Sequence, residues 1–465
     1  MSTSLYWLRQ DFRLHDNPAL SSAAKSGKVL CLYIHDTSLD KKLTVGEASQ
    51  WWLHHTLKNL DFNINIYKGR PVDVLTNLCN KYDCTEVFWN RCYAPHEIQR
   101  DKHIKSHLEA LNIKVTSSNG HLLWEPWTIH KQDGGHYRVF TPFYRKGCLQ
   151  ATKPRQPLPP PKHLETIRDS DSLDVDDLNL LPTWHQPLMS KWDITETGAH
   201  HQLKLFLEHG IHHYKEGRNL PAKPYISRLS PYLRWGHISP NQIWHTVTSW
   251  QDDDNVDTFC SELGWREFSY HLLYHYPDIR WRNLQSKFDV FPWQHDADKL
   301  KAWQTGQTGI PMVDAGMREL YQTGFMHNRV RMITASFLVK NLLLHWHHGE
   351  RWFWDCLLDA DPASNSAGWQ WVAGCGADAA PYFRIFNPVT QAEKFDPEGE
   401  YIKRFIPELK ALPTSYLFAP WTAPPLILQQ AGVQLGTTYP RPIVDLKQSR
   451  LEALEALKTT KASNE

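Results

Sequence analysis

The sequence predicts an α/β domain with a doubly wound parallel sheet, followed by an all-α domain that binds a ligand. Short apolar runs alternate with amphipathic segments at the start of the chain, which is typical of βαβ units. From about His200 onward the apolar residues follow a 3.6-residue period, and strand-like alternation becomes scarce. A chain of 465 residues is long enough for two domains. We expect an α/β domain over residues 1–125, a connector over 126–199 and a helical domain over 200–465.

Five short runs are expected to form the sheet. The second run, VLCLYIH, is almost continuously apolar, as in a parallel strand that is buried on both faces. The expected strands are Leu5–Leu8, Val29–His35, Ile64–Tyr67, Glu86–Trp89 and Ile113–Val115, and the expected helices between them are Glu47–Leu60, Pro71–Tyr82 and Pro95–Leu111. Because no G-x-G-x-x-G follows any of these strands, a dinucleotide is expected to bind elsewhere in the chain.

The connector contains QPLPPPK, whose prolines favour an extended backbone and block a helix. Beyond it, 3.6-residue spacing or strong helix composition predicts helices over Leu203–His209, Pro240–Trp250, Val256–Tyr274, Val313–Tyr321, Asn328–Trp346 and Arg351–Leu358.

Composition limits the possible functions. The formal net charge is +1, so a nucleic-acid partner would require positive charge gathered on one face. The eight cysteines form no C-x-x-C pair and are expected to be reduced thiols. The N-terminus lacks signal-peptide features and no apolar stretch approaches roughly 20 residues, which predicts a cytoplasmic protein. Metal binding is not expected, because the histidines occur as adjacent pairs that point in different directions on a helix.

Two predicted helices carry polar and charged side chains among mostly apolar residues. In FCSELGWREFSYHLL, the residues Glu262, Trp265, Arg266 and Ser269 share one helix face. That face is either a half-buried indole beside a surface ion pair or a pocket wall that stacks a base. In the second stretch, HNRVRMITASFLVKNLLLHW, an asparagine and two arginines begin an apolar helix, which fits either ordinary capping or a ligand contact.

Two further stretches suit a ligand. Asp359–Pro388 combines small residues, an asparagine, two tryptophans and acids with little helical periodicity, and small residues let backbone approach a ligand closely. We interpret it as a ligand site rather than plain core. Ser227–Leu233 offers hydroxyls, an arginine and backbone N–H groups that suit phosphate oxygens, although serine is also a common helix cap.

Together these stretches resemble the photolyase/cryptochrome family, and within it the class I photolyases of cyclobutane pyrimidine dimers. The motifs are WLRQDFRLHDNPAL, which resembles the opening strand, loop and helix, and GWREF, HNRVRMITASFLVKNLL and WQWVAGCGADAAPYFRIFNP. The resemblance covers nearly the whole chain. It implies a deoxyribodipyrimidine photo-lyase fold whose helical domain holds U-shaped FAD. It also implies blue-light-driven electron transfer from reduced FAD to dimers in UV-damaged DNA.

The resemblance implies a set of FAD contacts. Asn365 would face flavin N5, where a neutral amide favours the anionic reduced flavin, and Arg331 would pair with Asp359. The implied contacts are Tyr214, Ile226, Ser227, Arg228, Leu229, Ser230, Arg331, Asp359, Ala360, Asp361 and Asn365. A second, antenna chromophore is left open between folate and deazaflavin, because His96–Glu97 stands where folate-binding relatives show Asn–Glu.

The resemblance also implies an electron-transfer chain and a DNA site. Trp293, Trp346 and Trp369 would carry electrons during photoreduction, the alternative being three packed tryptophans. With Asn365 and Glu262 they form the implied catalytic set. A flipped dimer would lie between Trp265 and Trp371. The implied DNA and substrate contacts are Arg218, Glu262, Trp265, Arg266, Ser269, Asn328, Arg329, Met332, Trp371, Arg384 and Gln391.

Three readings of function stay open at this point. The first is dimer repair by a monomer that associates with the nucleoid through DNA and does not involve a membrane. The second is a cryptochrome-type blue-light receptor with the same flavin. The third is a helical nucleic-acid-binding protein without flavin. Asn328 and Met332 favour cyclobutane dimers, because (6-4) photolyases place a histidine pair at those positions.

Overall fold

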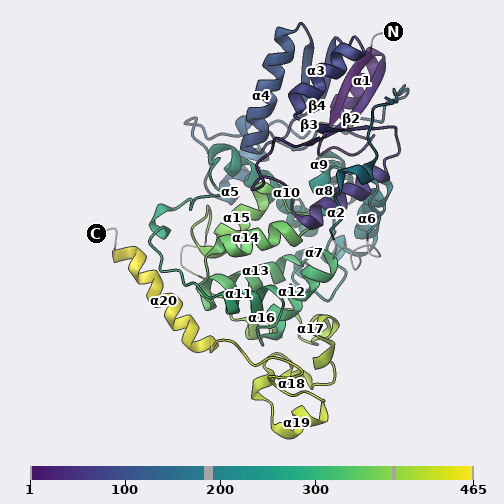
Figure 1. The fold of residues 1–465 in the computed structure, drawn as a ribbon. Helices are drawn as coiled ribbons and strands as arrows, with labels where there is room; N and C mark the ends of the chain where they lie inside the picture. The colour runs from purple at the N-terminus through teal and green to yellow at the C-terminus, as the bar shows by residue number, and fades with distance from the viewer. Residues whose placement is uncertain (1–2, 183–191, 380–383, 463–465) are drawn as a thin grey trace. The chain divides into compact units, whose positions relative to one another are not determined.

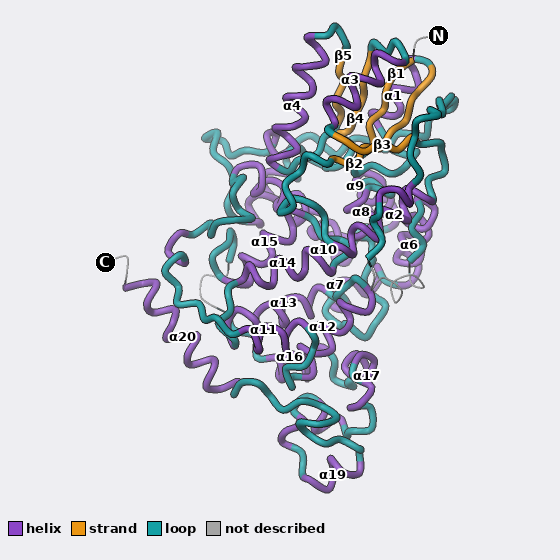
Figure 2. Tube along the Cα trace, viewed as in Figure 1, coloured by secondary structure: helices purple, strands orange, loops and turns teal. Residues whose placement is uncertain are grey.

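The computed structural model describes residues 3–182, 192–379 and 384–462. The chain divides into two compact units. The first comprises Met1–His212, Ser227–Pro277 and Leu358–Ala363, and the second comprises His213–Ile226, Asp278–Leu357 and Ser364–Glu465. The first unit contains a parallel sheet, and the second is built from helices and loops (Figures 1 and 2).

The five predicted strands form one parallel sheet with the order β3-β2-β1-β4-β5. The strands are β1 (Thr3–Leu8), β2 (Lys28–Asp36), β3 (Asn65–Gly69), β4 (Glu86–Asn90) and β5 (Lys114–Ser118). The chain winds from the central β1 outward to β3 and then returns to add β4 and β5 on the other side. This order confirms the predicted doubly wound α/β domain.

Helices cover the sheet because alternate strand residues point to opposite faces. Leu5 and Trp7 of β1 pack in one apolar cluster with Leu75 of α3 (Pro71–Lys81) and Ile104 of α4 (Pro95–Ala110). Ser4, Tyr6 and Leu8 face away from that cluster, toward α1 (Pro18–Ser26), where Ser4 Oγ donates to Ala23 O. The predicted helix over Glu47–Leu60 is α2 (Glu47–Lys58).

Protein side chains fill the carboxyl-terminal edge of the sheet between β1 and β4, where the winding reverses and such folds usually bind ligands. We call Tyr6, Asp11, Asn17 and Asn90 the sheet-end cluster; all four are buried. Asp11 accepts hydrogen bonds from Tyr6 OH and from Asn90 Nδ2, both at 2.6 Å, and from Arg9 N at 2.9 Å. Asn17 Nδ2 donates to Tyr6 OH at 2.6 Å. This packing agrees with the absence of a glycine-rich dinucleotide motif.

The remaining long helices of the first unit are α6 (Glu196–His209), α9 (Pro240–Trp250) and α10 (Asp254–His275), with the short α8 (Ser230–Trp235) and the single turn α5 (Phe140–Pro142). Helix α6 begins seven residues before the predicted Leu203, because Thr195 caps it by accepting the Gly198 N–H at 2.8 Å. The predicted Pro240–Trp250 agrees with α9, and Asp253 caps α10 just ahead of the predicted start.

The second unit is helical. Its helices are α7 (Tyr214–Gly217), α11 (Ala297–Gln304), α12 (Pro311–Thr323), α13 (Asn328–Ser336), α14 (Trp346–Cys356), α15 (Pro362–Ala373, whose first two residues belong to the first unit), α16 (Pro388–Phe395), α17 (Glu400–Phe405), α18 (Thr414–Leu417), α19 (Pro425–Gln430) and α20 (Leu446–Ala462). The predicted all-α half of the chain is thereby confirmed. Among the described residues, the model contains no helix with the length and apolar content needed to cross a membrane.

One prediction for this half was wrong, and one helix was missed. The single helix expected over Asn328–Trp346 is two helices: α13 passes into a wider π-helical turn at Phe337–Asn341, and Leu343 takes a left-handed φ of 55° before α14 starts. The segment Asp359–Pro388 has little helical periodicity and no helix was predicted in it, yet most of its first half is α15. Its many small residues carry little apolar contrast, so their period is hard to see; residues 380–383 lie outside the described residues.

Candidate functional site

Two predicted cofactor-binding segments lie side by side in the first unit. Ser230, the first residue of α8, donates from Oγ to Asp359 Oδ2 at 2.5 Å. Two further α8 side chains hold the same segment: Arg234 Nε donates to Ala360 O at 2.7 Å, and Trp235 Nε1 donates to Leu358 O at 3.2 Å. The fold therefore brings together residues that stand about 130 positions apart in the sequence.

The turn before α8 has an unusual backbone. Arg228 has a φ of 52°, a left-handed conformation that costs a non-glycine residue of the order of 1–3 kcal/mol and that is often found at binding sites. The turn is held from both sides, because Gln202 Nε2 donates to Ser227 O at 2.9 Å and the Arg228 guanidinium lies 4.7 Å from the Trp192 ring. The turn carries the hydroxyls of Ser227 and Ser230 and the guanidinium of Arg228, residue types that suit phosphate oxygens.

Asp361 has a structural role that the sequence did not predict. Its Oδ1 accepts the Ala363 N–H at 3.0 Å at the start of α15, and Tyr270 OH donates to its Oδ2. Burial, together with the charge of Asp361, holds the pKa of Tyr270 well above its usual range. The contact predicted between Asp361 and the adenine end of FAD stays a prediction.

Asn365 belongs to a buried polar group in the second unit that we call the Glu350 cluster, comprising Arg280, Glu350, Asn365 and Ser366. Asn365 Nδ2 donates to Glu350 O at 3.0 Å and to Glu350 Oε1 at 3.3 Å. Ser366 Oγ and Arg280 Nε each lie 3.4 Å from Glu350 Oε1. Burial raises the pKa of Glu350, although Arg280 opposes that shift. The amide nitrogen of Asn365 is thus turned toward Glu350 and its oxygen away from it.

The three predicted electron-transfer tryptophans all lie in the second unit and differ in exposure. Trp346 and Trp369 are buried, whereas Trp293 is partly exposed. The His345 ring lies between two of them, 5.0 Å from Trp293 and 5.6 Å from Trp346 by ring centroids. Trp346 Nε1 donates to Asn283 Oδ1 at 2.9 Å, which fixes its ring.

Other aromatic rings pack against Trp369. Phe353 lies 4.9 Å away and Trp303 6.1 Å away, both nearly perpendicular to it. Sequence reasoning missed Trp303 and His345, since nothing in a linear pattern distinguishes them from other core aromatics. Gly349, inside α14, makes room for Trp369: a Cβ added there would lie 2.0 Å from the indole ring. Glycine in a helix interior costs about 1 kcal/mol relative to alanine, so this close approach explains its presence.

Three predicted DNA-binding arginines of the second unit form a cationic group. Burial, followed by the charges of Arg218 and Arg384, lowers the pKa of Arg329. Arg329 is positioned by a hydrogen bond from Nη2 to Asn219 Oδ1 at 2.6 Å and lies 4.5 Å from the Phe395 ring. Like charges held this close favour an anionic partner such as a phosphate backbone.

The predicted face of α10 is only partly available. Trp265 is half-buried and stacks on Phe140 with centroids 3.8 Å apart, and Glu262 is also half-buried. Arg266, in contrast, points into the protein: Nη1 donates to Glu267 Oε1 at 3.1 Å, Nη2 lies 2.8 Å from His121 Nε2, and the side chain is 13% exposed. Ser269 is buried and donates to Trp265 O at 2.9 Å.

The other predicted side chains belong to the second unit. Asn328, at the start of α13, is exposed, and Met332 lies one turn later and is half-buried. Trp371 donates its indole N–H to Asp378 O at 3.0 Å. Arg331 Nε donates to Met326 O at 2.7 Å, and Gln391 on α16 is half-buried.

Tyr214, the first residue of α7, is buried, with the Arg218 guanidinium 5.6 Å from its ring. Ile226 is half-buried.

Because the predicted contacts are divided between the two units, the Arg331–Asp359 pair and the complete substrate pocket stay predictions.

Comparisons with known proteins identify the family of the chain. Family models for DNA photolyase and for the FAD binding domain of DNA photolyase match residues 4–162 and 259–459. The chain is 44% identical to the deoxyribodipyrimidine photo-lyase of Agrobacterium fabrum over 98% of both proteins. It is 35% identical to cryptochrome-2 of Arabidopsis thaliana, over 98% of this chain and 79% of that protein. A crystal structure of a class III photolyase from Agrobacterium tumefaciens superimposes with a TM-score of 0.95 and 43% identity, over 99% of this chain and 98% of that one.

Proposed function

We infer that this chain, which belongs to the DNA photolyase/cryptochrome family, is a lyase that uses blue light and FAD to split cyclobutane pyrimidine dimers in UV-damaged DNA. The observation that carries this function is the 44% identity to a deoxyribodipyrimidine photo-lyase over 98% of both chains. The identity to cryptochromes is lower, at 35%, so repair is favoured over signalling.

The residues present fit FAD. We propose that Ser227, Arg228 and Ser230 hold its phosphates, because all three belong to the strained turn that leads into α8. The remaining proposed contacts are Tyr214, Ile226, Leu229, Arg331, Asp359, Ala360, Asp361 and Asn365. When bound, FAD supplies the light-excited electron donor for dimer cleavage.

Asn365 is proposed to set the charge state of the flavin. A neutral amide, held in place by Glu350, adds no negative charge beside flavin N5 and so permits an anionic reduced ring. The protein's contribution is to position this amide and to exclude water around it, since Asn365 is buried.

Trp369, Trp346 and Trp293 are proposed to carry electrons from the protein surface toward the flavin. The supporting observation is their graded exposure, from two buried indoles to one that reaches solvent. The His345 ring contacts both Trp293 and Trp346. It therefore connects two indoles for which no direct ring contact is found among the described residues.

For DNA, we propose that Arg218, Arg329 and Arg384 bind phosphates, and that Trp265 and Trp371 pack against the extruded dimer while Glu262 accepts a hydrogen bond from a pyrimidine. Asn328, Met332 and Gln391 complete the proposed contacts. Arg266 and Ser269 are left out, because both side chains are engaged inside the protein. A damaged pair is easier to extrude than an intact one, since it stacks and pairs poorly.

Within the family, we infer class III rather than the class I placement predicted from the motifs. The support is the similarity to the Agrobacterium class III structure, at 43% identity over nearly the full length. We further propose that the protein acts as a monomer in the cytoplasm, associating with the nucleoid through DNA. A folate or deazaflavin antenna stays a prediction.

The decisive experiment is a repair assay with an oligonucleotide that carries one thymine cyclobutane dimer. The reduced, FAD-loaded protein should restore two thymines under blue light and not in the dark, whereas an oligonucleotide with a (6-4) photoproduct should remain unchanged. No light-dependent loss of the dimer would reject the enzyme and favour the photoreceptor.

A variant tests the electron-transfer chain separately. Trp293→Phe should slow photoreduction of oxidised FAD by at least about tenfold, because the exposed end of the chain is lost. Repair by chemically pre-reduced Trp293→Phe should stay at the wild-type rate. Wild-type photoreduction in this variant would refute the assigned chain while leaving the repair function intact.

A further inference from the structure

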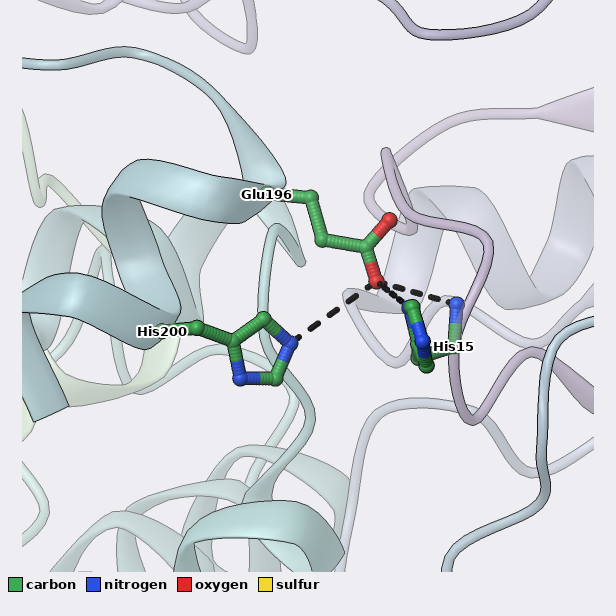
Figure 3. Close-up of side chains that lie close together, drawn as sticks. All are labelled: His15, Glu196 and His200. Atoms are coloured by element: carbon green, nitrogen blue, oxygen red, sulfur yellow. Dashed lines mark hydrogen bonds and ion pairs between the residues drawn. The ribbon is translucent and has the colours of Figure 1, made fainter. Parts of the chain in front are cut away.

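Three potential metal ligands converge in the first unit, from segments far apart in the sequence (Figure 3). His15 lies in the loop after β1, and Glu196 and His200 lie one turn apart on α6. His15 Nδ1 is 2.8 Å from Glu196 Oε1, and His200 Nε2 is 3.9 Å from the same oxygen. All three ligand atoms lie within 4.8 Å of one another.

The carboxylate at the centre of this group is fixed in place. Glu196 Oε2 accepts the Leu14 N–H at 2.7 Å, and Oε1 accepts the His15 N–H at 3.0 Å. The side chain is only 9% exposed. An oriented carboxylate is therefore present at the junction of the loop and the helix.

The two imidazoles can adjust around this fixed oxygen. The side chains of His15 and His200 are 49% and 40% exposed, and their rings approach edge to face with centroids 5.7 Å apart. Gln242 Nε2 lies 3.4 Å from His200 Nε2, a long contact to the imidazole lone pair that a bound ion would replace. Gln242 is itself held, since its Oε1 accepts the Ser239 N–H at 2.9 Å.

Both imidazoles lie within ion-pair distance of Glu196 Oε1, but only His15 Nδ1, at 2.8 Å, is close enough for a hydrogen bond; His200 Nε2 lies 3.9 Å away. Ligand atoms on one zinc ion, each about 2.0–2.2 Å from it, lie about 3–4 Å apart. The observed spacings need only small rotations of two half-exposed rings to reach that geometry.

We propose that His15, Glu196 and His200 bind one Zn²⁺ ion, with water completing the coordination. Two imidazoles and one carboxylate form a known zinc ligand set that leaves an open position. The ion would link the loop after β1 to the first turn of α6. None of these residues belongs to the proposed FAD or DNA contacts, so the site is independent of dimer repair.

Zinc affinity of variants tests the site directly. The FAD-loaded full-length protein is stripped with a chelator and titrated with ZnCl₂ in competition with a chromophoric zinc chelator. His15→Ala and His200→Ala should each weaken binding of one ion at least about tenfold. The matched control is His201→Ala, the neighbouring exposed histidine on α6 that points about 100° away from His200; it should bind like the wild type. Equal affinity in the wild type and the His15→Ala/His200→Ala double variant would overturn the proposal.

A second measurement separates this site from the rest of the 26 histidines of the chain. Zinc X-ray absorption of the one-equivalent complex should show two imidazoles, and that signature should disappear in the double variant. Thermal unfolding should shift upward with Zn²⁺ relative to chelator in the wild type and in His201→Ala, but not in the double variant. An unchanged imidazole signature in the double variant, or the same upward shift in it, would refute the site. Unaltered flavin absorption establishes that the variants fold, and their repair activity should match the wild type.

Discussion

The sheet-end cluster and the Glu350 cluster are both buried and polar, but they differ in how tightly their groups are bonded. At the sheet end, Asp11 accepts from Tyr6 and Asn90 at 2.6 Å, and Asn17 bonds Tyr6 at 2.6 Å and Asn90 at 2.8 Å. Around Glu350, the side-chain contacts fall between 3.3 and 3.4 Å. Short charge-assisted bonds are the strong ones, so the first cluster fixes the backbone where the sheet changes winding direction.

The longer contacts of the Glu350 cluster indicate where a bound cofactor is expected. Glu350 keeps a raised pKa because its neighbours do not fully compensate for its burial, and Asn365 beside it is the residue assigned to flavin N5. Undercompensated buried groups recur at functional sites, whereas complete networks mainly add rigidity. The comparison predicts a graded series of effects on stability.

The largest effect is expected for Asp11→Ala. This change leaves the Tyr6 hydroxyl, the Asn90 amide and the Arg9 N–H buried without their acceptor, which should cost about 3–5 kcal/mol of unfolding free energy. Urea denaturation measures it, with the exposed Asp61→Ala as the matched control. A loss of less than about 1 kcal/mol would remove the distinction between the two clusters.

A pH-dependent effect is expected for Lys340, a buried cation in the second unit. Burial, followed by the charge of Arg384, lowers its pKa from 10.5 to about 7. Between pH 7 and pH 10.5, Lys340 binds a proton in the unfolded chain more often than in the folded one. The free energy of unfolding therefore rises with pH in this range, by at most about 1.4 kcal/mol per pH unit from this group. Unfolding of the wild type and Lys340→Met at pH 7, 8 and 9 should show a shallower rise in the variant. Parallel pH profiles would mean that the folded protein holds this amine with an ordinary pKa.

The smallest effect is expected for Ser366→Ala. Its hydroxyl lies 3.4 Å from Glu350 Oε1, so removing it should cost only about 0.5 kcal/mol. Ser239→Ala provides the contrast, because that buried hydroxyl bonds Asp16 and also caps α9 by accepting the Gln242 N–H; its loss should cost about 2 kcal/mol. Similar costs for the two serines in chemical denaturation would contradict the proposed difference in bonding.

The sheet was predictable because its strands carry local signals. Continuous apolar runs such as Val29–His35 identify buried strands, and prolines at the starts of α3 and α4 mark helix ends, so all five strands were found. Helix α1 was implied only by the family resemblance, since its short sequence PALSSAAKS has few large apolar residues. The break after α13 was missed because its apolar pattern continues through the π-helical turn.

Contacts between distant segments were not predictable from the residues alone. The pairing of Ser230 with Asp359, the ring of His345 between two tryptophans and the inward turn of Arg266 all depend on tertiary packing. The same holds for the proposed zinc site, whose His15 and Glu196 stand 181 positions apart. Metal binding was not expected, because adjacent histidines on a helix point in different directions; the proposed site uses only one member of the pair on α6.

Gly349 is required for packing, and this requirement could be mistaken for a role in the photochemistry. Every other amino acid adds at least one carbon at a point 2.0 Å from the Trp369 indole. A deep mutational scan selecting for light-dependent survival should therefore accept only glycine at this position. The same scan scored for folded protein alone should return the same answer, which would identify position 349 as intolerant for reasons of space rather than of photochemistry.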